Sequence, residues 1–286
     1  MRVVVTGANG MVGRELVKQA QARGFSTVAL ARADLDIRDR VAAIHAIGEA
    51  KPDLVINAAA YTAVDEAETH PDLATEVNRD GASNVAHAAA QARAVIVHIS
   101  TDYVFDGASN VPYTPQSPPR PMSVYGATKL AGEDAVRREN GAHAIVRTSW
   151  LYNHDGRNFV RTMIRLARER ETIQVVDDQR GSPTLAVDLA AALLDAGVGV
   201  SRNQSLAGTY HFTNSGVATW LEFAQAIFDE VGIKGTRLIP TTTAEYKTAA
   251  RRPLYSVLDN ASFTTAFATQ PRHWREALHS IQAKLQ

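Results

Sequence analysis

Residues 2–13 read Arg-Val-Val-Val-Thr-Gly-Ala-Asn-Gly-Met-Val-Gly, and this stretch decides the fold. Its first five residues form a short run rich in valine, which is typical of a strand buried on both faces. Three glycines, Gly7, Gly10 and Gly13, follow at once and lead into a helical pattern over residues 14–23. Glycines in such a turn let the backbone approach a pyrophosphate and let the helix pack closely on the strand. The stretch therefore predicts the strand, turn and helix of a dinucleotide-binding domain.

The same alternation of strand and helix continues along the chain. Four more short apolar, β-branched runs are separated by helical patterns, at residues 26–30, 52–57, 95–99 and 142–147. Such alternation produces a parallel sheet with right-handed crossovers. We therefore expect an α/β fold with a Rossmann-like, doubly wound parallel sheet. Residues 1–150 are expected to form an NAD(P)-binding Rossmann domain, and residues 151–286 mainly a smaller α+β substrate-binding lobe with some segments returning to the first domain.

Within the second half, periodicity and helix-start signals predict further elements. We expect helices over residues 158–170, from Pro183 or Thr184, over residues 219–231 with Thr219 as N-cap, and from Pro271, together with strands over residues 173–176 and 209–213.

Composition limits the kinds of partner. Lys and Arg together number 30, as do Asp and Glu, so the formal net charge is zero and gives no bulk attraction to nucleic acid or to an anionic membrane. The chain has no cysteine, which excludes disulfides and cysteine-ligated metal. No apolar run approaches the roughly 18 residues of a membrane span. We expect a cytoplasmic protein, monomeric or homodimeric, with no nucleic-acid or membrane partner.

The choice of dinucleotide is indicated just after the second predicted strand. Arg32 stands where an NAD enzyme often has an acidic residue, and an arginine there accepts a 2′-phosphate. This favours NADPH, with NADH possible, although Arg32 also fits a solvated loop. Asp36 and Ile37 can flank an adenine, or belong to a helix-capping loop. The small side chains after the third strand, Ala59 and Ala60 among them, allow a flat cofactor to lie against backbone.

Candidate proton-transfer residues follow the predicted strand at 95–99. Ser100 and Thr101 stand at its carboxyl end, where open α/β sheets bind ligands. Tyr125 and Lys129 are four residues apart in a helical pattern, so phenol and ammonium share a helix face. A nearby ammonium favours the phenolate and lowers the pKa of the tyrosine, and Thr101 is placed to hold a carbonyl oxygen. Tyr-x-x-x-Lys also occurs by chance on amphipathic helices.

Taken together, the motifs are similar to those of the extended short-chain dehydrogenase/reductases, and within them to the branch that reduces dTDP-linked keto sugars. The matching segments follow the order of that family along nearly the whole chain: residues 6–13, 57–68, 100–107, 125–129, 147–150, 178–184 and 252–253. The segments at 57–68 and 100–107 are the ones most specific to this branch.

The resemblance implies a reaction and roles for individual residues. It implies reduction of the C4 keto group of a dTDP-4-keto-6-deoxyhexose by NADPH, with Tyr125 as general acid, Lys129 holding the nicotinamide ribose and Thr101 orienting the keto group. The implied cofactor-binding residues are Gly7, Gly10, Met11, Val12, Gly13, Arg32, Asp36, Ile37, Ala59, Ala60, Tyr125 and Lys129. The implied substrate-binding residues are Thr62, Val64, Thr101, Asp102, Tyr103 and Trp150.

Alternatives remain at both the residue and the function level. Trp150 also fits a core position and Asp102 a turn, while Arg251 and Arg252 suit either a diphosphate or plain surface. A nucleotide-sugar epimerase or dehydratase that retains NAD⁺, or a non-catalytic NADP-binding regulatory subunit, would share the superfamily motifs.

A metal site is doubtful. Some members of the family bind Mg²⁺ between subunits through glutamates. Glu15 matches one such position, but residues 185–187 read Leu-Ala-Val where another carboxylate is expected. Because a hard cation needs several oxygen ligands, we expect no metal.

Overall fold

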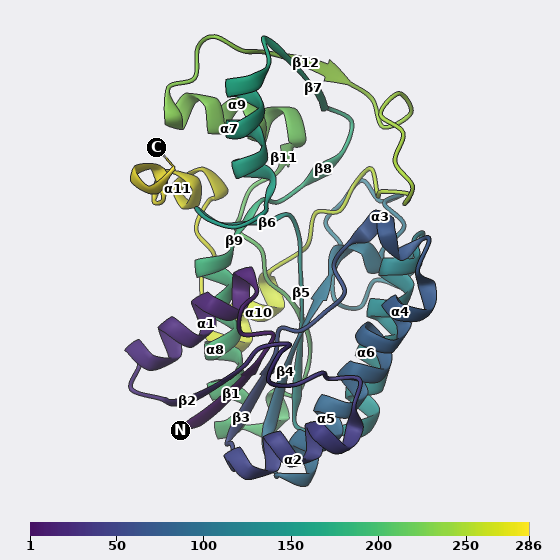
Figure 1. Ribbon diagram of the computed structural model, residues 1–286, viewed down its shortest axis with the longest axis vertical. Coiled ribbons are helices and arrows are strands. Elements are labelled where there is room, and N and C mark those ends of the chain that lie inside the picture. Colours follow the sequence, from purple (N-terminus) through teal and green to yellow (C-terminus); the bar gives the residue numbers. More distant parts are fainter. Residues whose placement is uncertain (286) are drawn as a thin grey trace.

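The computed structural model describes residues 1–285 and has a six-stranded parallel sheet at its centre (Figure 1). The strand order is β10-β5-β4-β3-β1-β2. The strands are β1 (Arg2–Thr6), β2 (Ser26–Leu30), β3 (Leu54–Asn57), β4 (Val95–Thr101), β5 (His143–Thr148) and β10 (Gly208–His211). The chain winds outward in opposite directions from β1, which confirms the predicted doubly wound α/β sheet. The resulting switch in strand order beside β1 is where such sheets bind ligands.

Helices cover both faces of the sheet because successive strand residues point to opposite sides. Val3 and Val5 enter the core beneath α1 (Met11–Ala22) and α8 (Ala186–Arg202). Val4 enters the opposite core, beneath α2 (Arg40–Ala50), α5 (Ala82–Gln91) and α6 (Val124–Glu139). Between β3 and α5 the chain forms α3 (Val64–Ala67), α4 (Pro71–Thr75) and a π-helical turn (Glu76–Gly81).

The smaller lobe lies over one end of the sheet, at the top of Figure 1. Its helices are α7 (Phe159–Glu169), α9 (Trp220–Val231) and α11 (Trp274–His279). Its strands pair as β7 (Thr172–Val176) with β12 (Arg237–Thr241), β6 (Leu151–Tyr152) with β9 (Thr184–Leu185), and β8 (Arg180–Gly181) with β11 (Ala218–Thr219). Its own core includes Tyr152, Phe223 and Trp274.

Several segments late in the sequence lie in the main layer rather than in the smaller lobe. β10 pairs in parallel with β5 at the edge of the sheet. α8 packs on α1 and across β3, β4 and β5, and α10 (Ala261–Phe267) packs on α8 and β10. The chain therefore leaves the main layer after β5, builds part of the smaller lobe, and returns.

Helix boundaries differ from the sequence predictions where tertiary contacts intervene. The first helix begins at Met11, three residues before the predicted start. Thr184 does not open a helix: it lies in β9, its N–H donates to the Trp150 carbonyl at 3.1 Å, and α8 begins at Ala186. The last helix begins at Trp274 rather than Pro271, with His273 as its N-cap.

Other predicted boundaries agree more closely with the structure. Thr219 caps α9 as predicted, and Glu222 completes a capping box with it. Strand β10 ends at His211, two residues before the predicted end, and β3 begins at Leu54, two residues after the predicted start. Short 3₁₀ turns occur at residues 102–104, 204–206 and 282–284. Through residue 285, no helix combines the length and apolar character needed to span a bilayer.

Candidate active site

The glycine turn after β1 is shaped by close approaches of backbone to backbone. Gly7 has a left-handed φ of 66°, and a Cβ there would stand 2.7–2.8 Å from backbone atoms of Ala58 and Ala59. A Cβ on Gly13 would collide with the Gly7 carbonyl. Only glycine fits these positions, and the turn brings the N-terminus of α1 to the carboxyl end of β3. An exposed helix N-terminus of this kind attracts phosphate.

Two adjoining cavities lie along this end of the sheet. The first has a volume of about 390 Å³, and the second, on the β2 side, about 230 Å³. Gly10 and residues 58–60 line both cavities, so the two cavities adjoin along the glycine turn. A groove with this path matches an extended dinucleotide that crosses a helix N-terminus.

All the predicted site residues line one or both cavities. The first cavity is lined by Gly10, Met11, Val12, Gly13, Ala59, Ala60, Thr62, Val64, Thr101, Asp102, Tyr103, Tyr125, Lys129 and Trp150, among others. The second is lined by Gly7, Gly10, Arg32, Asp36, Ile37, Ala59 and Ala60, among others. The fold therefore brings together residues up to 143 positions apart in the sequence.

Tyr125 and Lys129 reach the first cavity from the first turns of α6. Ser123 caps the helix, its hydroxyl accepting from the Gly126 N–H at 3.1 Å. A Cβ on Gly126 would collide with the Tyr103 carbonyl, so the start of α6 lies against the segment that follows β4. This contact sets the phenol and the amine beside the end of β4.

Burial moves the pKa values of both side chains. Burial, together with the charge of Asp102, raises the pKa of Tyr125 to about 12, while a hydrogen bond with Thr101 limits the rise. Burial lowers the pKa of Lys129 to about 8, and Glu133 opposes that shift. The sequence predicted a lowered pKa for the tyrosine, and this expectation is wrong because burial has the larger effect. Tyr125 is a phenol at neutral pH, which is the protonation state that an acid requires.

Thr101 and Asp102 form a hydrogen-bonded pair at the end of β4. The Thr101 hydroxyl donates to Asp102 Oδ1 at 3.0 Å and accepts from the Tyr103 N–H at 3.2 Å. Burial raises the pKa of Asp102 to about 6, and the bond from Thr101 limits the rise. Asp102 therefore takes part in the local turn and also lines the cavity.

A buried ion pair lies directly behind Lys129. Glu133, one helical turn further along α6, is 0 % exposed. Its oxygens accept from Arg147 of β5 at 2.8 and 2.7 Å and from the Ser100 hydroxyl at 2.6 Å. Burial alone would raise the pKa of Glu133, but the bonds from Arg147 hold it below its usual range. The pair fixes α6 against β4 and β5 and thereby positions Tyr125.

Trp150 lies on the wall of the first cavity rather than in the core. Its backbone adopts a left-handed φ of 49°, which is unusual for a large residue and typical of functional sites. Its indole stacks on Trp220 with ring centroids 3.6 Å apart, and Gly181 leaves room for it because a Cβ there would stand 2.5 Å from Nε1. The sequence did not indicate Trp220 as a partner.

A third cavity, of about 230 Å³, opens beside Trp220 in the smaller lobe. Arg252 lines it and donates to both carboxylate oxygens of Asp65, at 3.1 and 2.7 Å. Arg251 is exposed and lines none of the three cavities. The two arginines, which were equivalent by sequence, are therefore placed very differently.

Arg38 was missed by the sequence analysis. It lines the second cavity and donates to Asp36, with a shortest distance of 2.6 Å, and to Glu76 at 3.1 Å. The hydrogen bond from Arg38 lowers the pKa of Asp36 to about 2. Two arginines, Arg32 and Arg38, therefore face this cavity, and its acidic residue is already neutralised by one of them. In the sequence, only the position of Arg38 two residues after Asp36 could have indicated that it faces the cofactor groove.

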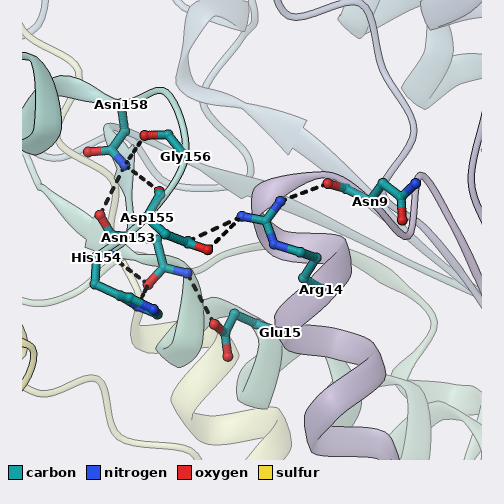
Figure 2. A network of polar contacts seen from close by, with 8 residues as sticks. All are labelled: Asn9, Arg14, Glu15, Asn153, His154, Asp155, Gly156 and Asn158. Atoms are coloured by element: carbon teal, nitrogen blue, oxygen red, sulfur yellow. Dashed lines mark hydrogen bonds and ion pairs between the residues drawn. The ribbon is translucent and has the colours of Figure 1, made fainter. Parts of the chain in front are cut away.

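Figure 2 shows how the smaller lobe is attached to the helix after the glycine turn. Arg14 donates to the Asn9 carbonyl at 2.9 Å and to both oxygens of Asp155 at 3.1 Å. Glu15 accepts from the Asn153 side chain at 3.1 Å, and Asn158 holds the loop by donating to the carbonyls of Asn153 and Asp155. The network fixes the loop at 153–158 next to the start of α1.

The same network includes Glu15, the residue that matches a Mg²⁺-binding position of the family. Glu15 is buried and hydrogen-bonded within the chain, and residues 1–285 bring together no group of three or more His, Cys, Asp or Glu side chains suited to a metal ion.

The sheet, the glycine turn after its first strand, and a tyrosine and a lysine one helical turn apart at the cleft together define an extended short-chain dehydrogenase/reductase. Within this class the chain belongs to the family described as RmlD substrate binding domain, whose family model matches residues 1–286.

Individual relatives are similar over nearly their whole length. The dTDP-4-dehydrorhamnose reductase of Streptomyces griseus is 45% identical, covering 97% of this chain and 91% of that protein. The dTDP-4-keto-6-deoxy-D-glucose reductase of Streptomyces niveus is 40% identical, covering 97% and 95%. The crystal structure of dTDP-4-dehydrorhamnose reductase from Bacillus anthracis in complex with NADP superposes with a TM-score of 0.91 at 41% identity, covering 98% of this chain and 97% of that one.

Proposed function

We propose that this protein is a dTDP-4-dehydrorhamnose reductase, which reduces the C4 keto group of dTDP-4-dehydro-L-rhamnose to dTDP-L-rhamnose with NADPH. One observation carries the proposal: a half-buried phenol, Tyr125, and a buried lysine, Lys129, line the first cavity together with Trp150, which stacks on Trp220 of the smaller lobe. The family membership and the near full-length likeness to named dTDP-4-dehydrorhamnose reductases support it.

The residues present fit the nicotinamide dinucleotide. The glycine turn provides a cradle that any Cβ at Gly7 or Gly13 would fill, and Arg32 and Arg38 provide cationic groups for a 2′-phosphate. When bound, NADPH supplies the hydride. Lys129 then holds the ribose and keeps its charge close to the phenol.

Tyr125 is the proposed general acid, and it donates its phenolic proton to the C4 oxygen. Thr101 orients the keto group, but its hydroxyl already donates to Asp102. When the substrate arrives, the Thr101 hydroxyl turns from the carboxylate toward the keto oxygen. Thr62, Val64, Asp102, Tyr103 and Trp150 form the proposed sugar pocket.

The nucleotide part of the substrate fits the third cavity, on the other side of the tryptophan pair. Trp220 and Phe159 form an aromatic wall against which a base can pack, and Arg252 offers a guanidinium to the diphosphate. Arg251, exposed and outside the cavity, is not part of this proposal.

The direct test is the decay of NADPH absorbance on addition of dTDP-4-dehydrorhamnose. Multiple turnover with stoichiometric formation of dTDP-L-rhamnose is the expected result. No turnover together with release of bound NAD⁺ on denaturation would favour an epimerase or dehydratase. No turnover together with copurification of a larger enzyme would favour a regulatory subunit. Comparing dTDP-4-dehydrorhamnose with dTDP-4-keto-6-deoxy-D-glucose addresses the choice of sugar.

Replacing Arg32 or Arg38 by alanine is expected to weaken NADPH binding by about 10- to 150-fold while leaving NADH binding nearly unchanged, because one charge-assisted bond contributes about 1.5–3 kcal/mol. The dissociation constants of both cofactors are measured by fluorescence titration. Arg251→Ala, an exposed arginine outside the cavities, is the control. Equal weakening of NADPH and NADH would contradict a contact with the 2′-phosphate.

We further propose that the protein acts in the cytoplasm as a monomer or homodimer. Both proposed reactants are phosphorylated nucleotides, and such charged molecules do not cross membranes unaided. Light scattering coupled to gel filtration distinguishes monomer from dimer.

A further inference from the structure

A row of buried polar side chains crosses the sheet beneath the cofactor groove. Thr6, Asn57 and His98 are direct neighbours in register on β1, β3 and β4, so their side chains emerge on the same face. Each is about 1 % exposed. The Thr6 hydroxyl donates to Asn57 Oδ1 at 2.7 Å, and Asn57 Nδ2 lies 3.1 Å from His98 Nδ1. This row has no part in the proposed mechanism so far.

The direction of these hydrogen bonds is fixed by one backbone group. The Ala59 N–H, which can only donate, points at Asn57 Oδ1 at 3.2 Å. That oxygen is therefore the acceptor end of the amide, and Nδ2 is the donor that faces His98 Nδ1. Nδ1 must accept, so a neutral His98 carries its proton on Nε2. A doubly protonated ring would set two donors against each other.

The protonated nitrogen of His98 faces Lys129. Nε2 lies 3.5 Å from Lys129 Nζ, and the same Nζ donates to the Ile99 carbonyl at 2.6 Å. An ammonium has only donors, so as an ammonium Lys129 meets a second donor at His98. As an amine it has a lone pair that accepts from Nε2–H. The contact with His98 therefore favours the amine form.

We propose that His98 is a positioning residue that acts through Lys129: locked by Asn57 as the Nε2–H tautomer, it stabilises the amine that remains after Lys129 has given up a proton. The inference rests on the proposed reductase function. Each reduction consumes one proton from solvent in addition to the hydride. When Tyr125 gives its proton to the C4 oxygen it becomes a phenolate, and a proton released by the Lys129 ammonium restores the phenol. Solvent then reprotonates the amine.

Burial lowers the pKa of Lys129 to about 8, so the ammonium predominates at neutral pH while the amine is within reach. On α6 it is followed by Glu133, which favours the ammonium, and preceded by the neutral phenol of Tyr125. Arg147 of β5 and Arg137 of α6 both pair with Glu133 and so reduce its effect. From β4, burial and the charge of Lys129 hold the pKa of His98 well below its usual range, so the ring stays neutral. Asp102 is the remaining acid that lines the cavity.

The tautomer is tested directly by ¹⁵N NMR of the full-length protein labelled at histidine. The signals of His98 are assigned as those absent from His98→Gln or His98→Asn. We expect a protonated Nε2 and an unprotonated Nδ1 that do not titrate between about pH 6 and 8, where an ordinary histidine changes charge. A proton on Nδ1, or a ring that titrates in this interval, would overturn the proposal. This readout needs no substrate, so it stands even if the proposed reaction proves wrong.

The effect on Lys129 is tested with His98→Gln, whose amide oxygen can accept from an ammonium. This hydrogen bond stabilises the ammonium and raises the pKa of Lys129. Because the proposed step needs the ammonium, activity falls as Lys129 loses its proton at high pH, and in the variant the midpoint of that fall should move upward by about one pH unit. His143→Gln, on the neighbouring strand at the opposite end of the sheet, should leave the profile unchanged. A uniform loss of activity with an unmoved profile would show that His98 is merely structural and would overturn the proposal.

Discussion

Replacing Tyr125 by phenylalanine is expected to lower kcat for the reduction of dTDP-4-dehydrorhamnose by about 10²–10⁴-fold, the usual contribution of a general acid. The change removes one oxygen from a side chain that is packed edge-on against Tyr103, with ring centroids 5.5 Å apart. Because this packing is kept, KM and the dissociation constant for NADPH should change little. The measurement is NADPH absorbance under saturating substrate, combined with NADPH titration.

Tyr255→Phe provides the matched control. Tyr255 is also partly buried, but it lies outside the three cavities and should tolerate the same change with full activity. If Tyr125→Phe retained the activity of the unmodified protein, another group would have to supply the proton, and Asp102 would be the first residue to examine.

Replacing Glu133 by alanine is expected to lower the free energy of unfolding by about 3–5 kcal/mol, the usual cost of removing one partner from a buried ion pair. The loss arises because Arg147 would remain buried and charged without its two carboxylate bonds. Denaturant-induced unfolding followed by circular dichroism measures it.

The neighbouring residue supplies the control for this stability change. Asp134 also pairs with Arg137, but its side chain is 61 % exposed, so Asp134→Ala should change the free energy of unfolding by less than about 1 kcal/mol. A double variant, Glu133→Gln with Arg147→Met, should recover part of the loss because it removes both buried charges, while the partly exposed Arg137 keeps Asp134 as its partner. Equal effects of Glu133→Ala and Asp134→Ala would contradict the role assigned to the buried pair.

The parts of the fold and site that the sequence predicts are those encoded locally. Gly7 and Gly13 stand in one short turn, and Tyr125 and Lys129 are one helical turn apart, so spacing alone places them. The doubly wound sheet follows from the alternation of strand and helix patterns along the chain, and each of these patterns can be recognised without distant contacts. The placement of these residues around the groove was therefore predictable, although their chemical roles remain proposals.

What the sequence could not supply depends on contacts between distant segments. Trp220 stacks on Trp150 across 70 positions of sequence, and no local pattern marks that pairing. The row from Thr6 to His98 depends on strand register. The direction of the Tyr125 pKa shift depends on burial, which outweighs the hydrogen bond with Thr101. The local sequence predicted a helix start at Thr184. The hydrogen bond from its N–H to the Trp150 carbonyl, which places it in a strand, comes from a distant segment and leaves no local pattern.

Because β10 joins the sheet late in the sequence, the sheet stays incomplete during part of the synthesis of the chain. About 60 residues separate the end of β5 from the start of β10, and at about 5–20 residues per second their synthesis takes about 3–12 s. During that interval the edge of β5 has no neighbour, and the face that α8 will cover is incomplete. Unpaired edges and bare apolar faces are the surfaces through which nascent chains aggregate. Protection by chaperones is therefore most valuable to this chain in the middle of its synthesis, before the last strand closes the sheet.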